Sequence, residues 1–351
     1  MQSGSILNRL PVIIIALLAV SAAVGLTIAL QNSPKGPVVV IYTALDEQFS
    51  RPILDKFTEQ TGIRVLAKYD TESTKSVGLT QALFAERSRP RCDVFWNNEM
   101  VNTLRLARDG LLQDRDSSLY AEFPTEYRSK ENLWCGFAAR ARVLLVNTDL
   151  VSDQDFPSGI EDLCDPMWKD RVGIAKPLAG TTASHAACLF AVWGEERTKD
   201  FFRRLKANAQ VLGGNKQVAR AVATGSLAFG ITDTDDALIE LEAGFPVAII
   251  YPDQEEDQLG TLFIPNTVAM VKGAPHEKSA QKLIEFLLSP EVEEILAAGP
   301  SAQIPLRPGV PKSDRVESPA TVKAMQVDFQ KAAATWNAAA QFLRSEFATA
   351  E

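Results

Sequence analysis

The segment Val38-Val39-Val40-Ile41-Tyr42 opens the body of this chain and decides its fold class. A run of β-branched and aromatic residues is typical of a strand that is buried on both faces, as in a parallel sheet. A helical pattern follows, because apolar residues recur at every fourth position from Phe49 to Phe57 and Gly62 stands where a helix C-terminus favours positive φ. Strand character resumes from Ile63 to Tyr69. The sequence therefore predicts an α/β protein with a parallel sheet.

The same alternation of short apolar runs and helical patterns continues along the chain. Two runs on either side of Arg140 are predicted to be separate strands and to mark the crossover to a second lobe. The predicted strands after the first two cover residues 92–96, 134–139, 143–147, 172–175, 228–231, 247–251 and 267–271. The predicted helices after the first cover residues 75–87, 100–109, 182–193, 197–208, 217–224, 236–243, 276–288 and 320–348.

The body is too long for one compact core, so two lobes of ordinary domain size are expected. The last predicted strand, 267–271, is assigned to the first lobe, and the chain then crosses between the lobes at least twice. The first lobe is predicted to comprise residues 34–138 and 262–305. The second is predicted to comprise residues 139–261 and 306–351.

The N-terminal residues 1–33 carry an uncharged apolar stretch from Leu10 to Leu30. About 20 apolar residues suffice for a transmembrane helix, whereas the apolar core of a cleaved signal is usually roughly 7–15 residues long. The stretch therefore predicts a signal anchor, and Arg9 on its N-terminal side favours a cytoplasmic N-terminus. Cleavage after Ser21-Ala22-Ala23 is the alternative. Either way, the body is expected in the periplasmic or extracytoplasmic space, anchored or secreted.

Composition excludes some functions. The chain is 46% apolar and 23% charged, with a net charge of −8 and a pI near 5.1. An acidic chain lacks the basic face that a nucleic-acid partner requires, whereas a cationic ligand would be attracted. The four cysteines match no metal-site spacing and are expected to be buried thiols, with a Cys164 to Cys188 disulfide as the alternative.

Polar residues follow the predicted strands, at the edge where ligands bind in open α/β sheets. Acidic residues there could bind a metal ion, and the glycine turn before the helix at 182–193 could hold an anion with its free N–H groups. The candidate metal ligands are Asp46, Glu99, Asp233, Asp235 and Asp236. The candidate residues for other ligand contacts are Tyr42, Thr43, Asn98, Arg140, Gly180, Thr181, Thr182 and Thr234.

Structural roles are open alternatives for several of these residues. Asp46, Asp235 and Asp236 could cap or open helices, which stabilises by roughly 0.5–2 kcal/mol. Glu99 could be a first-turn acid, and Arg140 could form a surface ion pair worth about 0–1 kcal/mol. Tyr42 could be a strand residue whose hydroxyl finds a partner.

Four collinear segments carry a family resemblance. They are Val40-Ile41-Tyr42 before an acidic helix start, Asp93 to Glu99, Gly136 to Val143 and Gly225 to Gly230. In this order they resemble the ferric-iron class of extracytoplasmic solute-binding proteins of ABC importers, over most of residues 38–305. The resemblance implies a two-lobed type 2 periplasmic-binding fold with a cleft between the lobes. It also implies an ABC permease and its ATPase as partners.

By this resemblance, Glu99 matches an iron-ligating carboxylate and Asp46 falls near a histidine ligand. The family's two adjacent tyrosines would lie near Thr234 and Asp235 and are absent here. Carboxylates without phenolates also suit other hard cations. The predicted ligand is thus iron(III), another hard metal ion, or a small anionic solute held by Arg140 and Gly180 to Thr182.

Two other functions are alternatives to transport. Asp233-Thr234-Asp235 follows a predicted strand as in magnesium-dependent phosphatases, with Asp233 as nucleophile, but Ala237 stands where a hydroxyl residue is usual. A membrane-anchored ligand sensor would carry the same motifs. Solute binding without catalysis is the preferred hypothesis, and no cofactor is required for it.

Overall fold

The computed structural model describes residues 36–70, 75–115 and 118–348. Within these ranges, no helix has both the length and the apolar character that crossing a bilayer demands. The predicted anchor, Leu10 to Leu30, lies outside the described residues.

The first half of the sheet is mainly parallel, as the opening strand predicts. Its strands run in the order β2 (Arg64–Tyr69), β1 (Val38–Thr43), β3 (Val94–Asn97) and β10 (Phe263–Val271). Strand β1 pairs in parallel with β2 and β3, whereas β10 is antiparallel to β3. The short β4 (Leu112–Gln113) pairs with β10. We call this half, with its helices, the first lobe.

A single long strand, β5 (Cys135–Asn147), connects the halves. Its first part pairs with β10 and its second part with β8 (Phe229–Asp233) and β9 (Val247–Ile250). The prediction of two strands around Arg140 is therefore wrong. The strand bends instead of ending, since Ala138 has a φ of 44° and the pairing with β10 shifts register between Pro265 and Asn266.

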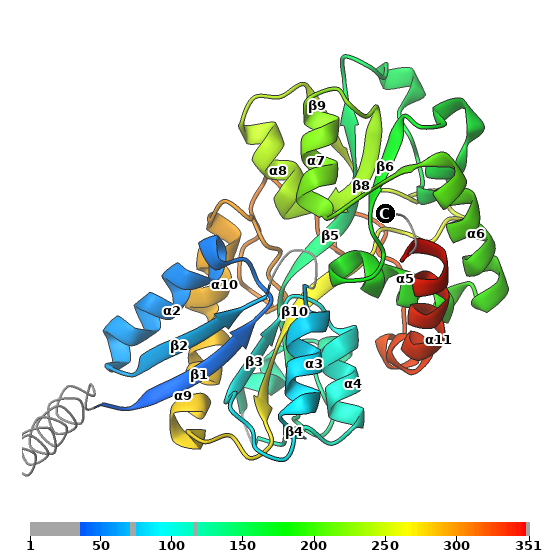
Figure 1. Cartoon of the computed structure of the whole chain (residues 1–351). Coiled ribbons are helices and arrows are strands. Elements are labelled where there is room, and N and C mark those ends of the chain that lie inside the picture. Colours follow the sequence, from blue (N-terminus) through cyan, green and yellow to red (C-terminus); the bar gives the residue numbers. More distant parts are fainter. Residues whose placement is uncertain (1–35, 71–74, 116–117, 349–351) are drawn as a thin grey trace, which may run out of the picture. The chain divides into compact units, whose positions relative to one another are not determined.

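The second half of the sheet is built on β8. Strand β6 (Val172–Ala175) pairs in parallel with β8 and with β7 (Gln210–Leu212). We call this half, with its helices, the second lobe. Figure 1 shows the two groups of strands, with β5 and β10 running between them.

Helices cover both lobes close to the predicted positions. The first lobe carries α2 (Glu47–Thr61), α3 (Val77–Ala85), α4 (Val101–Arg108), α9 (Glu277–Leu287) and α10 (Pro290–Ala298). The second lobe carries α5 (Gly180–Val192), α6 (Glu195–Asn208), α7 (Asn215–Ala223) and α8 (Thr234–Glu242). The 3₁₀ helices are η1 (Ser118–Glu122), η2 (Thr125–Tyr127), η3 (Asp153–Asp155), η4 (Ile160–Cys164) and η5 (Pro166–Trp168). The sequence did not predict α10, β4 or β7.

The C-terminal helix α11 (Phe329–Phe347) packs against α4 of the first lobe and α5 and α6 of the second. It was predicted to begin at Ala320 but begins after Asp328, whose carboxylate accepts hydrogen bonds from the N–H groups of Gln330 and Lys331. In this helix, Phe342 is buried and Ala334 is exposed.

The four cysteines are buried free thiols, as expected. Burial raises the pKa of the Cys164 thiol to about 12 and those of the other three further above the ordinary value. They therefore behave as small core residues.

Candidate ligand site

The chain places a buried carboxylate, Asp233, at the C-terminal end of β8. It accepts hydrogen bonds from Arg142 Nη1 at 2.7 Å, Thr181 Oγ1 at 2.6 Å and Asn215 Nδ2 at 3.0 Å. Burial acts to raise the pKa of Asp233, but the two arginines Arg142 and Arg140 outweigh it and hold the pKa below its ordinary value. Asp233 is therefore ionised and fully partnered within the second lobe.

Arg140 lies in the middle of β5 and is 3% exposed, so the surface ion pair considered for it is wrong. Its Nη1 lies 3.8 Å from Asp233 Oδ2 and 3.7 Å from Asp235 Oδ2. Its Nη2 donates to the backbone oxygen of Asn98 in the first lobe. Arg140 thus ties the acidic end of β8 to the first lobe.

Three of the predicted metal ligands come together. Asp233, Asp235 and Asp236 are buried, and one oxygen from each lies within 4.8 Å of the others. Burial raises the pKa of Asp235, with Arg140 acting against the rise and Asp233 adding to it. The carboxylate of Asp233 does not cap α8, although Asp233 occupies the N-cap position. We call these three residues the acidic group.

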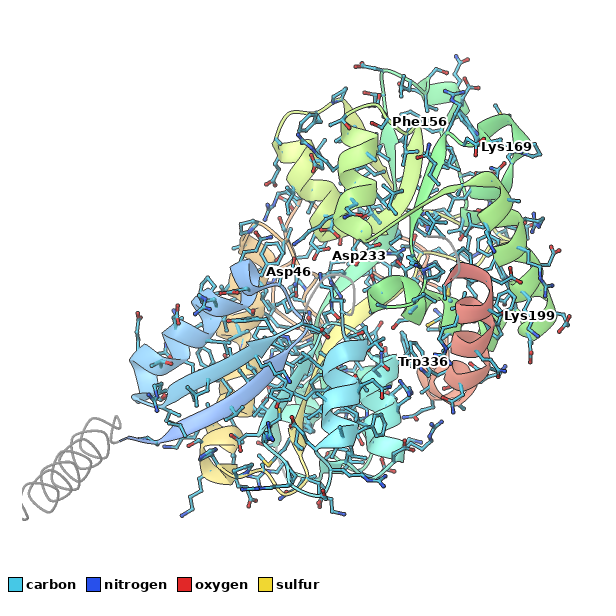
Figure 2. The ribbon with its side chains drawn as sticks, in the orientation of Figure 1. Asp46, Phe156, Lys169, Lys199, Asp233 and Trp336 are labelled. Atoms are coloured by element: carbon cyan, nitrogen blue, oxygen red, sulfur yellow. The ribbon has the colours of Figure 1, made fainter. Side chains whose placement is uncertain are left out.

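Asp46 lies across from the acidic group, at the start of α2. Its side chain makes no cap hydrogen bond, so the capping alternative is not supported. Its carboxylate instead pairs with Lys75 Nζ at 2.6 Å and with Lys216 on α7 of the second lobe. Burial opposes ionisation, yet these two lysines hold the pKa of Asp46 below its ordinary value. Figure 2 labels Asp46 and Asp233 between the lobes.

Glu99 is fully buried and lies outside the acidic group, so its role as a metal ligand stays a prediction. Its carboxylate accepts from Asn97 Nδ2 at 2.6 Å, from the N–H of Asn102 in the first turn of α4 at 3.1 Å, and from Ser184 Oγ on α5 at 2.6 Å. The first-turn alternative is not borne out in the strict sense, because Glu99 precedes the N-cap residue Met100 and only its carboxylate reaches back to the first turn of α4. Glu99 also links the two lobes.

Three further candidates make structural contacts. The Tyr42 hydroxyl donates to Glu86 at 2.9 Å, which confirms the strand-residue alternative. Thr43 Oγ1 accepts from the N–H of Leu45 at 3.2 Å. Thr234 Oγ1 accepts from the N–H of Ala141 in β5 at 3.2 Å. A ligand role for these three stays a prediction without a contact that supports it.

A cavity of about 240 Å³ lies beside the acidic group, and we call it the anion cavity. Helices α5 and α7 both begin at its wall, with Gly180 to Thr182 and Gly213 to Asn215. Lys75 and Lys176 also line it. Asn98 and the ionised Asp233 also line it, and Asn98 Oδ1 is buried without a hydrogen-bond donor among the described residues. Helix N-termini and lysines together favour a bound anion.

The sequence did not identify Lys75, Lys176 or Asn215 as site residues. The Gly213-Gly214 pair before α7 was the available signal, because it parallels the glycine turn before α5.

Residues 101–333 match the family of bacterial extracellular solute-binding proteins. The chain belongs to this family. It is 28% identical to iron uptake protein A1 of Synechocystis sp. over 307 residues, covering 82% of this chain and 83% of that protein. It is 26% identical to the Fe(3+)-binding periplasmic protein of Serratia marcescens over 286 residues, covering 80% and 82%. These relatives confirm the resemblance to the ferric-iron class.

A solved structure supports the assignment of the fold. The crystal structure of iron-bound HitA from Pseudomonas aeruginosa aligns with a TM-score of 0.81 and 24% identity, covering 89% of this chain and 99% of that one. This likeness shows the two-lobed fold of solute-binding proteins. In this solute-binding protein, the acidic group and the anion cavity both lie at the ends of the second-lobe strands, with Asp46 and Asn98 contributed by the first lobe.

Proposed function

We propose that this solute-binding protein captures iron(III) outside the cytoplasmic membrane and delivers it to an ABC permease and its ATPase. The names of its relatives support iron. The acidic group is the observation that carries the proposal, because three converging carboxylates are hard oxygen ligands suited to a hard cation. The apolar N-terminal segment, predicted to be an anchor, suits this location.

Both lobes contribute to the proposed metal site. Arg140 and Arg142 compensate the acidic group, and Lys75 and Lys216 compensate Asp46. A trivalent cation is strongly attracted to four carboxylates and competes with these side chains for them. Displacement of Lys75 and Lys216 would then free Asp46 as a fourth ligand and draw the first lobe onto the cation.

The phosphatase alternative is not supported by the geometry. Asp233 is surrounded by Arg142, Thr181 and Asn215 and is thereby committed to hydrogen bonds. Its nucleophilicity is reduced accordingly. We therefore infer a binding protein without catalytic activity.

The experiment compares the metal response of two variants in the full chain. Iron(III), supplied as its nitrilotriacetate complex, should raise the melting temperature of the wild-type protein, because a ligand that binds only the folded state stabilises it. Asp235→Asn should lose most of this rise. Glu256→Gln, in an exposed loop, should retain it. Metal analysis of protein purified from its own host should find iron in the wild type and less in the Asp235 variant. Equal responses from both variants would contradict the proposed site.

The anion cavity supports a second candidate, a small anionic solute. The two lysines and two helix N-termini of its wall would outweigh Asp233 and hold a phosphate or carboxylate group, and Asn98 Oδ1 would accept from a donor on the ligand. Inorganic phosphate should then raise the melting temperature without iron. Lys176→Met should remove the phosphate response and leave the iron response unchanged, which separates the two candidates.

A further inference from the structure

We propose that a second cavity, enclosed by α3, α4, α5 and α11, is a binding site for a small organic carboxylate with an apolar body. We call it the α11 cavity. The proposal does not depend on which ligand occupies the site between the lobes.

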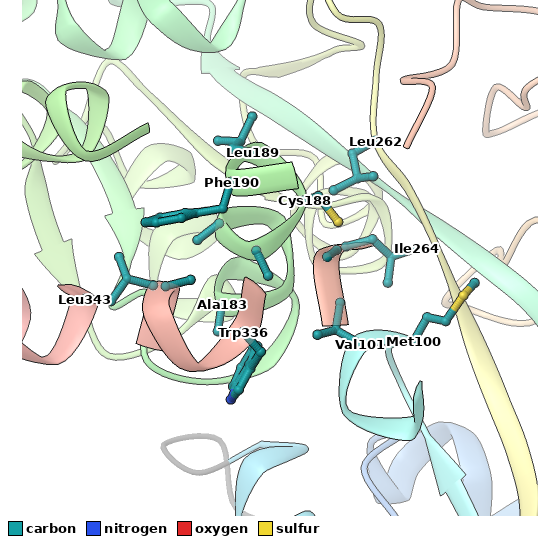
Figure 3. Close-up of a cluster of buried hydrophobic side chains, with 14 of the residues drawn as sticks. Met100, Val101, Ala183, Cys188, Leu189, Phe190, Leu262, Ile264, Trp336 and Leu343 are labelled. Atoms are coloured by element: carbon teal, nitrogen blue, oxygen red, sulfur yellow. The ribbon is translucent and has the colours of Figure 1, made fainter. Parts of the chain in front are cut away.

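The α11 cavity has a volume of about 350 Å³, within the range of small-molecule sites. Its apolar wall includes Val77 on α3, Leu178 before α5, and Trp336 and Leu343 on α11. Figure 3 shows Trp336 and Leu343 on α11 close to Ala183 on α5, which also lines the cavity. Two arginines, Arg105 and Arg344, line it, and none of the described residues of the lining carries a carboxylate.

Arg105 is the group that indicates an anion. It is 8% exposed, and its guanidinium lies 4.9 Å from the ring centre of Trp336. Its Nη1 donates to Asn102 Oδ1, whereas Nε is buried without an acceptor among the described residues. A buried donor without a partner costs free energy. Burial also lowers the pKa of Arg105, with Glu99 acting against the shift.

The guanidinium of Arg105 favours a carboxylate. Arg105 lines the cavity, and a guanidinium presents paired N–H groups that match the two oxygens of a carboxylate. Arg344 adds a second positive charge from the opposite wall, on α11. The indole of Trp336 and the surrounding aliphatic side chains then suit an apolar body on the carboxylate rather than a bare inorganic anion.

The position of the α11 cavity connects it to the site between the lobes. Val77 and Arg105 belong to the first lobe, whereas Leu178 and Ala183 belong to the second, and Leu178 also lines the anion cavity. Asn102, which holds Arg105, donates its backbone N–H to Glu99, and Glu99 also accepts from Ser184 on α5. A ligand that contacts both lobes biases their arrangement, so the two sites should be energetically coupled.

The test uses phenylacetate as the probe and phenylacetamide, its uncharged analogue, as the control ligand. In the full chain, phenylacetate at about 10 mM should raise the melting temperature by about 2 °C, and phenylacetamide should have a clearly smaller effect. Arg105→Lys keeps the positive charge but loses the paired N–H groups that can bind both oxygens of a carboxylate. It should weaken phenylacetate binding about fivefold or more.

Two variants avoid disturbing the buried arginine. Arg344→Gln removes the second charge, and Ala340→Phe fills the cavity from α11; both should reduce phenylacetate binding. Arg197→Gln, an exposed position on α6, should bind like the wild type. An absence of stabilisation by phenylacetate, an equal effect of phenylacetamide, or unchanged binding in both cavity variants would overturn the proposal.

Discussion

At the residue scale, the buried acids of this protein differ in how completely they are hydrogen-bonded. Glu293 accepts from three backbone N–H groups, those of Ala138, Leu306 and Arg307, at 2.8–2.9 Å. Asp253 is 6% exposed and accepts from the N–H of Ile160 through Oδ1, but its Oδ2 has no donor among the described residues. Asp253 therefore carries an uncompensated burial cost when it is ionised.

This cost predicts a pH-dependent stability at Asp253. Burial raises its pKa from the ordinary 3.8 to about 6. Between these values the folded protein holds a proton that the unfolded chain has lost, so stability falls as pH rises through this range and stays lower above pH 6. Asp253→Asn removes this loss. Relative to the wild type, the variant should therefore gain up to about 3 kcal/mol of unfolding free energy between about pH 4 and about pH 7.

Urea denaturation at the two pH values measures this gain. Asparagine also suits the backbone, because Asp253 has a φ of 65°. Asp257→Asn, an exposed position in the same loop, is the control and should show no such pH dependence. A gain at Asp253→Asn that is the same at both pH values would contradict the explanation.

At the scale of the element, the start of α11 depends on one cap. Asp328 Oδ1 accepts from the N–H groups of Gln330 at 2.9 Å and Lys331 at 3.1 Å. Asp328→Ala should therefore cost about 1 kcal/mol of unfolding free energy. Urea denaturation checks this, with Asp314→Ala, an exposed position in the preceding loop, expected to be neutral. If the two variants lose the same stability, the cap is not what fixes the helix start.

The elements also show where sequence reasoning succeeds. The end of α2 was predicted from Gly62, which has a φ of 69° in the structure, because a helix terminus is a local signal. The continuity of β5 was not predicted, because Arg140 interrupts its apolar pattern and is accommodated only by Asp233, Asp235 and Asn98 from distant segments. A local sequence pattern does not reveal which distant residues will contact a buried arginine.

The difference between local signals and contacts from distant segments also applies to the site. Acidic residues after β8 were predicted and do converge, since the carboxyl end of a strand fixes their position. Of the neighbours Asn98 and Glu99, the sequence favoured Glu99 as metal ligand, but Asn98 lines the anion cavity while Glu99 is turned into contacts with α4 and α5. Which of two adjacent side chains faces a cavity depends on backbone geometry that composition does not reveal.

At the scale of the whole body, the lobes are held together by a few polar contacts besides β5 and β10. Ser184 Oγ on α5 donates to Glu99 at 2.6 Å, Lys216 on α7 pairs with Asp46, and Arg140 donates to the backbone oxygen of Asn98. A two-lobed binding protein opens and closes around its ligand, so such contacts set the population of the closed arrangement.

Weakening these contacts should favour the open arrangement without unfolding either lobe. The double variant Ser184→Ala with Lys216→Met removes one buried hydrogen bond and one partly exposed ion pair, together worth about 1–3 kcal/mol. Small-angle X-ray scattering of the ligand-free protein should give a larger radius of gyration. Because a ligand that binds the closed form must first restore it, iron(III) affinity should fall by about three- to tenfold or more.

The matched control is Arg204→Met, which removes an ion pair with Asp200 inside α6 of the second lobe. It should leave both the radius of gyration and the affinity unchanged.

Lys216→Met also frees Asp46 from a competing cation, which by itself would strengthen metal binding. If the double variant binds iron(III) more tightly than the wild type while its radius of gyration stays the same, Lys216 acts as a competitor for Asp46 and not as a tie between the lobes. A larger radius of gyration together with weaker iron(III) binding would show that Ser184 and Lys216 hold the two lobes together.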